Sequence, residues 1–178
     1  MYCPICKHTA MHRNQLEENL TAYECSQCSG RWIASYQYWQ WQEKSGKSLL
    51  ASSAMDDARL SVQDNPKAKL CPECGHFLRR FPVGHGVEFS LDHCGNCGGI
   101  WFDKNEWEVL KGRGLHDDVH KIFSEIWQNQ VRQEQQARAM DEMYKARFGP
   151  SDYAKIIDVK QWLQAHPLRS ELLAFLKA

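Results

Sequence analysis

The sequence has no long apolar run and no excess of charge of either sign. A transmembrane helix needs roughly 18 or more consecutive apolar residues, so the chain offers no membrane span. Lys plus Arg and Asp plus Glu number 22 each, which gives a formal net charge of zero. A nonspecific nucleic-acid binder usually carries a basic surface, and this balance does not provide one.

The start of the chain lacks both the basic region and the apolar stretch of a signal peptide, since Met1 and Tyr2 lead directly into Cys3. We therefore expect a cytoplasmic protein in a reducing compartment. Disulfides belong mainly to exported chains, so four disulfides are the less favoured explanation for eight cysteines.

No cysteine is left over from the C-x2-C pattern. The loops between the pairs hold 18 and 19 residues (7–24 and 75–93), a spacing typical of small structural zinc sites. Four thiolates around one Zn²⁺ leave no open coordination position, so such a site stabilises a fold and does not activate water. We expect two zinc ions per chain, held within each set: Cys3, Cys6, Cys25 and Cys28 in the first, and Cys71, Cys74, Cys94 and Cys97 in the second. Iron in a rubredoxin-like site and a redox use of the thiols are the alternatives.

The two cysteine sets belong to an internal repeat, offset by 68 residues between Cys3 and Cys71 and by 69 between Cys25 and Cys94. A glycine and a tryptophan follow the last cysteine of each set, outside the ligands. A unit of about 45 residues buries too little apolar surface to fold unaided, so a metal is expected to stabilise each copy.

The second copy shows the pattern of a β-hairpin. Apolar residues alternate with polar ones over 77–83 and 87–91, on either side of Gly84-His85-Gly86. After Trp101, the D-x-x-E box of Asp103 and Glu106 predicts the start of a short helix. The first copy has Ser35–Trp41 at the corresponding place, where the acidic box is missing and Ser35 is the candidate cap.

These motifs resemble a known family. The second copy combines Cys-Pro-x-Cys and Leu78 with Cys-x2-Cys-Gly-Gly-x-Trp-Phe-Asp-x-x-Glu, and so is similar to transcription factor IIB-type zinc fingers, which are zinc ribbons. The first copy keeps its four cysteines, Pro4, Gly30 and Trp32, but departs from the pattern after Trp32. The resemblance implies tandem zinc ribbons with metal ligands at all eight cysteines. It does not by itself give a function.

The sequence therefore predicts an α+β protein with two small zinc-ribbon β-hairpin modules and an α-helical C-terminal region. We place the first ribbon at 1–44, a linker with one weak helix near 49–60 at 45–69, and the second ribbon at 70–114. The helical region is 115–178, with a long helix to about 148 and two shorter ones after it. Val119, Ile122, Phe123, Ile126 and Trp127 share one predicted face of the long helix.

Other groups have more than one interpretation. His116 and His120 share an i, i+4 spacing that resembles half of a protease zinc site, but the acidic residues between them also suit a simple helix start. Trp32 is expected in the core, whereas Tyr38, Trp39 and Trp41 are too many for one side of a ribbon and predict contact with a partner or with the C-terminal helices. His8, His76 and His93 are candidate hydrogen-bond donors to thiolates. Arg79 and Arg80 are expected on a solvated strand face.

The function predicted from the sequence is that of a non-enzymatic zinc-binding interaction module, with a protein as its expected partner. Nucleic-acid binding linked to transcription is one alternative, and a metal-dependent hydrolase or redox protein is another. The sequence leaves the partner and the oligomeric state open.

Overall fold

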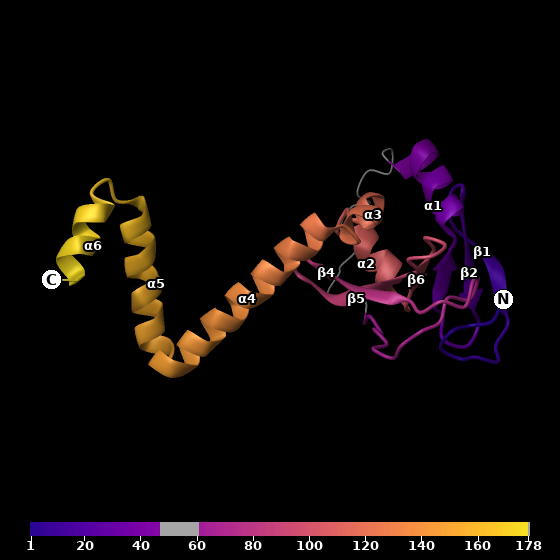
Figure 1. The fold of residues 1–178 in the computed structure, drawn as a ribbon, viewed down its shortest axis with the longest axis horizontal. Helices are drawn as coiled ribbons and strands as arrows, with labels where there is room; N and C mark the ends of the chain where they lie inside the picture. Colours follow the sequence, from indigo (N-terminus) through magenta and orange to yellow (C-terminus); the bar gives the residue numbers. More distant parts are fainter. Residues whose placement is uncertain (47–60, 178) are drawn as a thin grey trace. The chain divides into compact units, whose positions relative to one another are not determined.

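The computed structural model describes residues 1–46 and 61–177 and confirms the α+β class with a helical C-terminal region (Figure 1). The strands are β1 (Met11–Glu17), β2 (Leu20–Cys25), β3 (Arg31–Ile33), β4 (Arg79–Gly84), β5 (Val87–His93) and β6 (Ile100–Phe102). The helices are α1 (Ser35–Trp41), α2 (Glu106–Gly112), α3 (Val119–Ile122), α4 (Glu125–Phe148), α5 (Pro150–Ala165) and α6 (Arg169–Lys177), with a π-helical turn η1 (Gln42–Gly46) and a 3₁₀ turn η3 (His116–Asp118).

The two copies of the repeat share one sheet within the described residues. Its strand order is β1-β2-β3-β6-β5-β4, and all pairs are antiparallel. The short strands β3 and β6 join the copies at the centre, where Trp32 lies opposite Trp101. The resulting order is symmetric, because each copy contributes a hairpin outside and one short strand inside. The two copies thus form a single sheet, a pairing that the tandem repeat did not predict.

The predicted second hairpin is present as β4 and β5, each slightly shifted from the expected range. The turn between them places Gly84, His85 and Gly86 at positive φ. Val83, Phe89 and Leu91 are buried, as the period-2 pattern requires. The alternation therefore sets which face of the hairpin meets the core.

A short helix follows the inner strand of each copy and carries large residues into the core. Trp41 of α1 packs edge-on against Trp107 of α2, with ring centroids 5.5 Å apart, and both rings are fully buried. Tyr38 and Trp41 are 1% and 0% exposed. These two aromatics therefore do not face a separate partner. They fill the space between the two copies and contact the start of the C-terminal region, Tyr38 at His120 of α3 and Trp41 at His116 of η3, which is the second of the two contacts predicted for them.

The start of α2 corrects the predicted capping box. Only its Glu106 half forms, as the Glu106 carboxylate accepts the backbone N–H of Asp103 at 2.8 Å. The Asp103 carboxylate instead accepts the Trp101 indole N–H at 2.7 Å. The residue before the helix is Asn105, whose backbone has a left-handed conformation. In α1 the same device recurs, since the Gln37 side chain accepts the Ala34 N–H at 3.3 Å. Ser35 is the first helical residue and not the cap.

The predicted linker is partly built into the second copy. Lys69 is 1% exposed, and Asn65 donates its backbone N–H to Asp103 at 2.8 Å. The weak helix predicted near 49–60 lies outside the described residues. The stretch 61–69 therefore covers the carboxylates at the start of α2.

The predicted long helix is interrupted after α3. Ser124 caps a new helix by accepting the backbone N–H of Trp127 at 3.3 Å, so α4 starts at Glu125. Val119 and Ile122 are fully buried as predicted, but Ile126 is 75% exposed because the break rotates the apolar face. Trp127 donates its indole N–H to the Val83 carbonyl at 2.7 Å and so fastens the start of α4 to β4.

The chain divides into two compact units, Met1–Val131 and Arg132–Ala178. The first holds the sheet, α1 to α3 and the beginning of α4. In the second, α4 ends at Phe148 and α5 begins at Pro150, as the Gly149-Pro150 pair predicted. None of the described helices is both long and apolar enough to cross a membrane.

Candidate metal centres

Four similar backbone turns present the eight cysteines. In each turn the residue after the second cysteine has positive φ and donates its N–H to the carbonyl of the first cysteine, at 2.8 or 2.9 Å. Gly75 and Gly98 hold this position in the second copy, and Lys7 and Ser29 hold it in the first. The turn therefore does not depend on glycine.

The eight predicted ligands gather into two groups of four. Within each group the four sulfur atoms lie within 4.8 Å of one another. The Sγ atoms of Cys3 and Cys28 are 3.6 Å apart, and those of Cys74 and Cys94 are 3.5 Å apart. A tetrahedral zinc ion with Zn–S bonds of about 2.3 Å requires sulfur atoms about 3.8 Å apart. Each group thus fits one zinc ion, and the chain fits two.

The two groups are partly enclosed in the same way. The first cysteine of every pair is buried, and the second is intermediate: Cys3, Cys25, Cys71 and Cys94 are buried, and Cys6, Cys28, Cys74 and Cys97 are half-exposed. All eight cysteines are free, so no disulfide joins them. Backbone N–H groups point at the sulfurs, as when Cys6 donates to Cys3 Sγ at 3.3 Å and Cys74 to Cys71 Sγ at 3.4 Å. Such donors stabilise thiolates bound to a metal.

The protonation of the thiols links metal binding to pH. Burial raises the pKa of Cys3 and of Cys71 to about 11 each. At the exposed Cys74, a hydrogen bond with the backbone of His76 lowers the pKa to about 6. Because a thiol loses its proton when it binds zinc, zinc binding releases protons, and the zinc affinity falls in acid.

The histidines near the cysteines differ in their contacts. The His76 ring lies 3.2 Å from the carbonyl of Cys74, and His93 stacks on Phe123 at 4.3 Å between centroids. Burial lowers the pKa of His93 and favours its neutral form. The His76 side chain also forms a hydrogen bond with the Cys74 thiol that contributes to its lowered pKa, whereas His93 packs against Phe81 and Phe123.

His116 and His120 do not assemble a metal site with other ligands in the described part of the chain. His116 is 2% exposed and lies between the rings of Trp41 and Trp107. The ring of His120 faces Tyr38, whose hydroxyl is 3.3 Å from Nδ1. Trp39, 45% exposed, packs against His120 at 5.0 Å. Both histidines therefore belong to the contact between α1 and the segment after α2.

A carboxylate cluster, formed by Asp64, Asp103 and Glu106, also has ligand atoms within 4.8 Å of one another. Two side chains of the protein already supply its positive charge. Lys69 Nζ lies 2.6 Å from Asp92 and 3.3 Å from Asp103. One Arg80 nitrogen donates to both oxygens of Asp64, at 2.8 and 2.6 Å, which places this arginine in a structural pair and not on a solvated face. The cluster is therefore an internal ion-pair network.

Within the described residues, Oε1 of Glu106 and Oδ1 of Asp92 are buried atoms of this network without a hydrogen-bond partner. Burial, followed by the negative charge of Asp103, raises the pKa of Glu106 well above its usual value. The protonated form is thus favoured at this position. Sequence reasoning identified the Asp103–Glu106 spacing but missed Lys69, whose neighbours in the sequence read as a linker.

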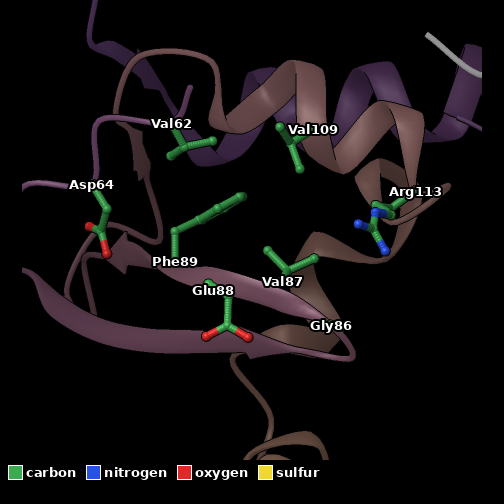
Figure 2. A pocket seen from close by; sticks show the side chains of 8 residues that line it. All are labelled: Val62, Asp64, Gly86, Val87, Glu88, Phe89, Val109 and Arg113. Atoms are coloured by element: carbon green, nitrogen blue, oxygen red, sulfur yellow. The ribbon is translucent and has the colours of Figure 1, made fainter. Parts of the chain in front are cut away.

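A hollow of about 360 Å³ lies between the second hairpin and α2. Figure 2 shows Val87 and Phe89 pointing from β5 toward Val62 and Val109, while Glu88 points from the opposite face of the strand. Its lining residues include no hydroxyl, thiol or imidazole. The hollow therefore does not hold a serine–histidine or cysteine–histidine pair.

The comparisons with known proteins match one family, and the match lies in the second copy. Residues 70–113 match the model of a family described as Transcription factor zinc-finger, the TFIIB-type zinc ribbon. This segment is less than half of the chain and contains the second cysteine group. No curated protein and no solved structure matches the chain. The segment 70–113 is thus a zinc ribbon by sequence, and the chain carries a second four-cysteine group of the same geometry.

Proposed function

We propose that this chain is a non-enzymatic tandem zinc-ribbon protein whose C-terminal helices bind another protein. In this proposal, the first copy is a second ribbon that has lost the sequence features after Trp32. The symmetric sheet supports this, because both copies contribute a hairpin, a short strand and a helix in the same order. Eight free thiols suit a reducing compartment, and we place the protein in the cytoplasm.

The observation that carries the proposal is the apolar surface of Arg132–Ala178. The helices α5 and α6 have no buried residue. Large apolar side chains nevertheless stand exposed along these helices and the end of α4: Met140, Met143, Tyr144, Phe148, Ile156, Val159, Trp162, Leu168, Phe175 and Leu176. Exposed apolar patches of this kind mark interaction sites on soluble proteins.

A groove in this unit supports a helix or loop of a protein as the ligand. It has a volume of about 520 Å³ and is lined by α4 and α5, with Met140, Tyr144, Phe148 and Ile156 among its apolar residues. Asp141 and Lys160, which carry opposite charges, also line it. Residues 132–178 hold 8 Lys and Arg against 6 Asp and Glu, which gives a net charge of only +2. An apolar groove with nearly balanced charge suits a protein partner better than a phosphate backbone.

The metal groups support a scaffold role for the rest of the chain. Two closed all-cysteine sites leave no coordination position for substrate or water. The zinc ions would stabilise the sheet, and the sheet would present the helices.

A capture experiment tests this function. Full-length protein with Trp162→Glu is compared with the neighbouring Gln161→Glu, since Trp162 is an exposed apolar residue and Gln161 an exposed polar one. After nuclease treatment, we expect cross-linked protein partners with the wild type and with Gln161→Glu, and their loss with Trp162→Glu. All three should hold two zinc ions by elemental analysis. Recovery of nucleic acid in place of protein, with binding that weakens steeply in salt, would support the transcription-related alternative.

A further inference from the structure

We propose that the two zinc sites are energetically coupled, so that zinc at one site raises the affinity of the other. Each copy places a tryptophan on a metal-binding turn of the other copy. The two turns and the two indoles form one contact between the copies, and this contact forms fully only when both sites are folded.

The contact begins with Trp32 of the first copy. Its ring packs on Gly99, where an added Cβ would lie 2.1 Å from Cζ2 of the indole. The Gly99 carbonyl accepts the backbone N–H of Cys94 at 2.9 Å, so this glycine closes one metal-binding turn of the second site. The Trp32 indole also donates to Glu73 at 3.3 Å, and Glu73 lies between Cys71 and Cys74. One side chain thus touches both turns of the other copy's site.

The reciprocal contact is made by Trp101. Its ring packs on Gly30, where an added Cβ would lie 2.2 Å from Cζ2. The carbonyl of Gly30 accepts the N–H of Cys25 at 2.9 Å, which closes a turn of the first site. The two indoles lie opposite each other in the β3–β6 pair and are fully buried. All eight cysteines belong to the apolar cluster that contains both rings, or pack against it.

This geometry leads to coupling because the turns are built around the metal. A four-cysteine site is rarely preformed without its metal, so the free energy of metal binding includes the free energy of folding the turns. If the second site is empty, Gly99 and Glu73 no longer form a fixed surface for Trp32. The first site then folds without part of its packing, and its zinc affinity falls. By linkage, the effect is the same in both directions, and couplings of this type commonly reach about tenfold or more.

Native mass spectrometry of the full-length wild type at half-saturating zinc tests the coupling directly. Two equal and independent sites give about one half of the chains with a single zinc, and unequal independent sites give more. A tenfold positive coupling lowers this fraction to about one quarter, with the zinc-free and two-zinc forms enriched. A fraction below one half requires positive coupling, whereas a fraction of one half or above that does not rise further in Gly99→Ala would overturn the proposal.

Two glycine variants that keep all eight cysteines test whether the contact of Trp32 with Gly99 transmits the coupling. Gly99→Ala forces Trp32 from its place, whereas Gly95→Ala adds a methyl group with no atom within 4 Å, at a backbone position without positive φ. We expect Gly99→Ala to return the one-zinc fraction to one half or above and Gly95→Ala to leave it as in the wild type. An unchanged fraction in Gly99→Ala would show that Trp32 does not carry the coupling. The proposal does not depend on what the C-terminal helices bind.

Discussion

Trp32 and Trp101 face each other across the pair of short strands that joins the two four-cysteine copies. Each indole packs on the glycine that follows the last cysteine pair of the other copy. This reciprocal packing explains why a glycine and a tryptophan recur outside the ligands in both copies. The two copies are therefore one sheet and one core, and the following predictions depend on that unity.

Gly30→Ala should destabilise the zinc-loaded protein by about 1–3 kcal/mol, the usual cost of overpacking a core. The added methyl group would lie 2.2 Å from the Trp101 ring, which is fully buried and would have to shift within a packed core. Denaturant unfolding with zinc in excess measures the change. Gly95→Ala, with open space around the new Cβ, is the control and should stay within about 0.5 kcal/mol of the wild type.

Lys69→Met should cost about 3–5 kcal/mol, because it leaves Asp92 and Asp103 as buried charges without their ammonium partner. Lys67, an exposed lysine of the same segment, provides the control in Lys67→Met. A loss below about 1 kcal/mol for Lys69→Met would show that the buried network does not hold segment 61–69 in place. The double variant Lys69→Met with Asp92→Leu should recover part of the loss, since it removes one of the uncompensated charges.

Glu106→Gln should stabilise the protein at neutral and alkaline pH. Burial raises the pKa of Glu106 in the folded state above its value in the unfolded chain. The unfolded state therefore releases this proton first, and wild-type stability falls as pH rises above about 4.5, the ordinary glutamate value. The amide of the variant does not titrate, and it keeps an oxygen for the Asp103 N–H. The gain should grow in chemical denaturation as pH rises above about 4.5. A variant that is less stable at every pH would contradict this account.

His116 should give the opposite pH dependence. Burial lowers the pKa of this imidazole in the folded state below the ordinary value of 6.5, although Asp117 and Glu17 favour its charged form and Lys111 opposes it. The unfolded chain then binds a proton first, so stability is complete above about pH 6.5 and is lost as pH falls below it. The loss is at most about 1.4 kcal/mol per pH unit.

The variant His116→Leu isolates this group. It keeps an apolar side chain between Trp41 and Trp107 but does not titrate. With zinc held in excess, the difference in unfolding free energy between wild type and variant should change from pH 7.5 to pH 5.5. A constant difference over this range would mean that His116 does not change its charge on unfolding.

Much of the fold follows from local sequence, and the rest depends on contacts between distant residues. The cysteine spacing indicates two metal groups because the ligands of each lie on short turns, and alternation in 77–91 indicates the β4–β5 hairpin. The β3–β6 pair is different, because a three-residue strand has almost no periodic signal. Its formation depends on two indoles and two glycines that lie about 68 residues apart in the sequence.

Contacts between distant residues also explain why some predictions for single residues were wrong. Tyr38 and Trp41 looked like surplus aromatics because their partners lie far along the sequence, in α2 of the other copy and in the segment 116–120 at the start of the C-terminal region. Asp103 fits a helix cap by spacing, but Trp101, Asn65 and Lys69 compete for its carboxylate. The break at Ser124 had a local signal, since a serine before Glu125 is a common helix start, and the continuous apolar stripe concealed it.

The central claim is that both four-cysteine copies unfold as one domain. Hydrogen exchange on the zinc-loaded full-length protein, measured at increasing denaturant, tests it most directly. The account predicts that amides in β2 and in β5 exchange with the same opening free energy and the same denaturant dependence. Exchange of one strand at clearly lower free energy, while the other keeps its protection, would contradict it.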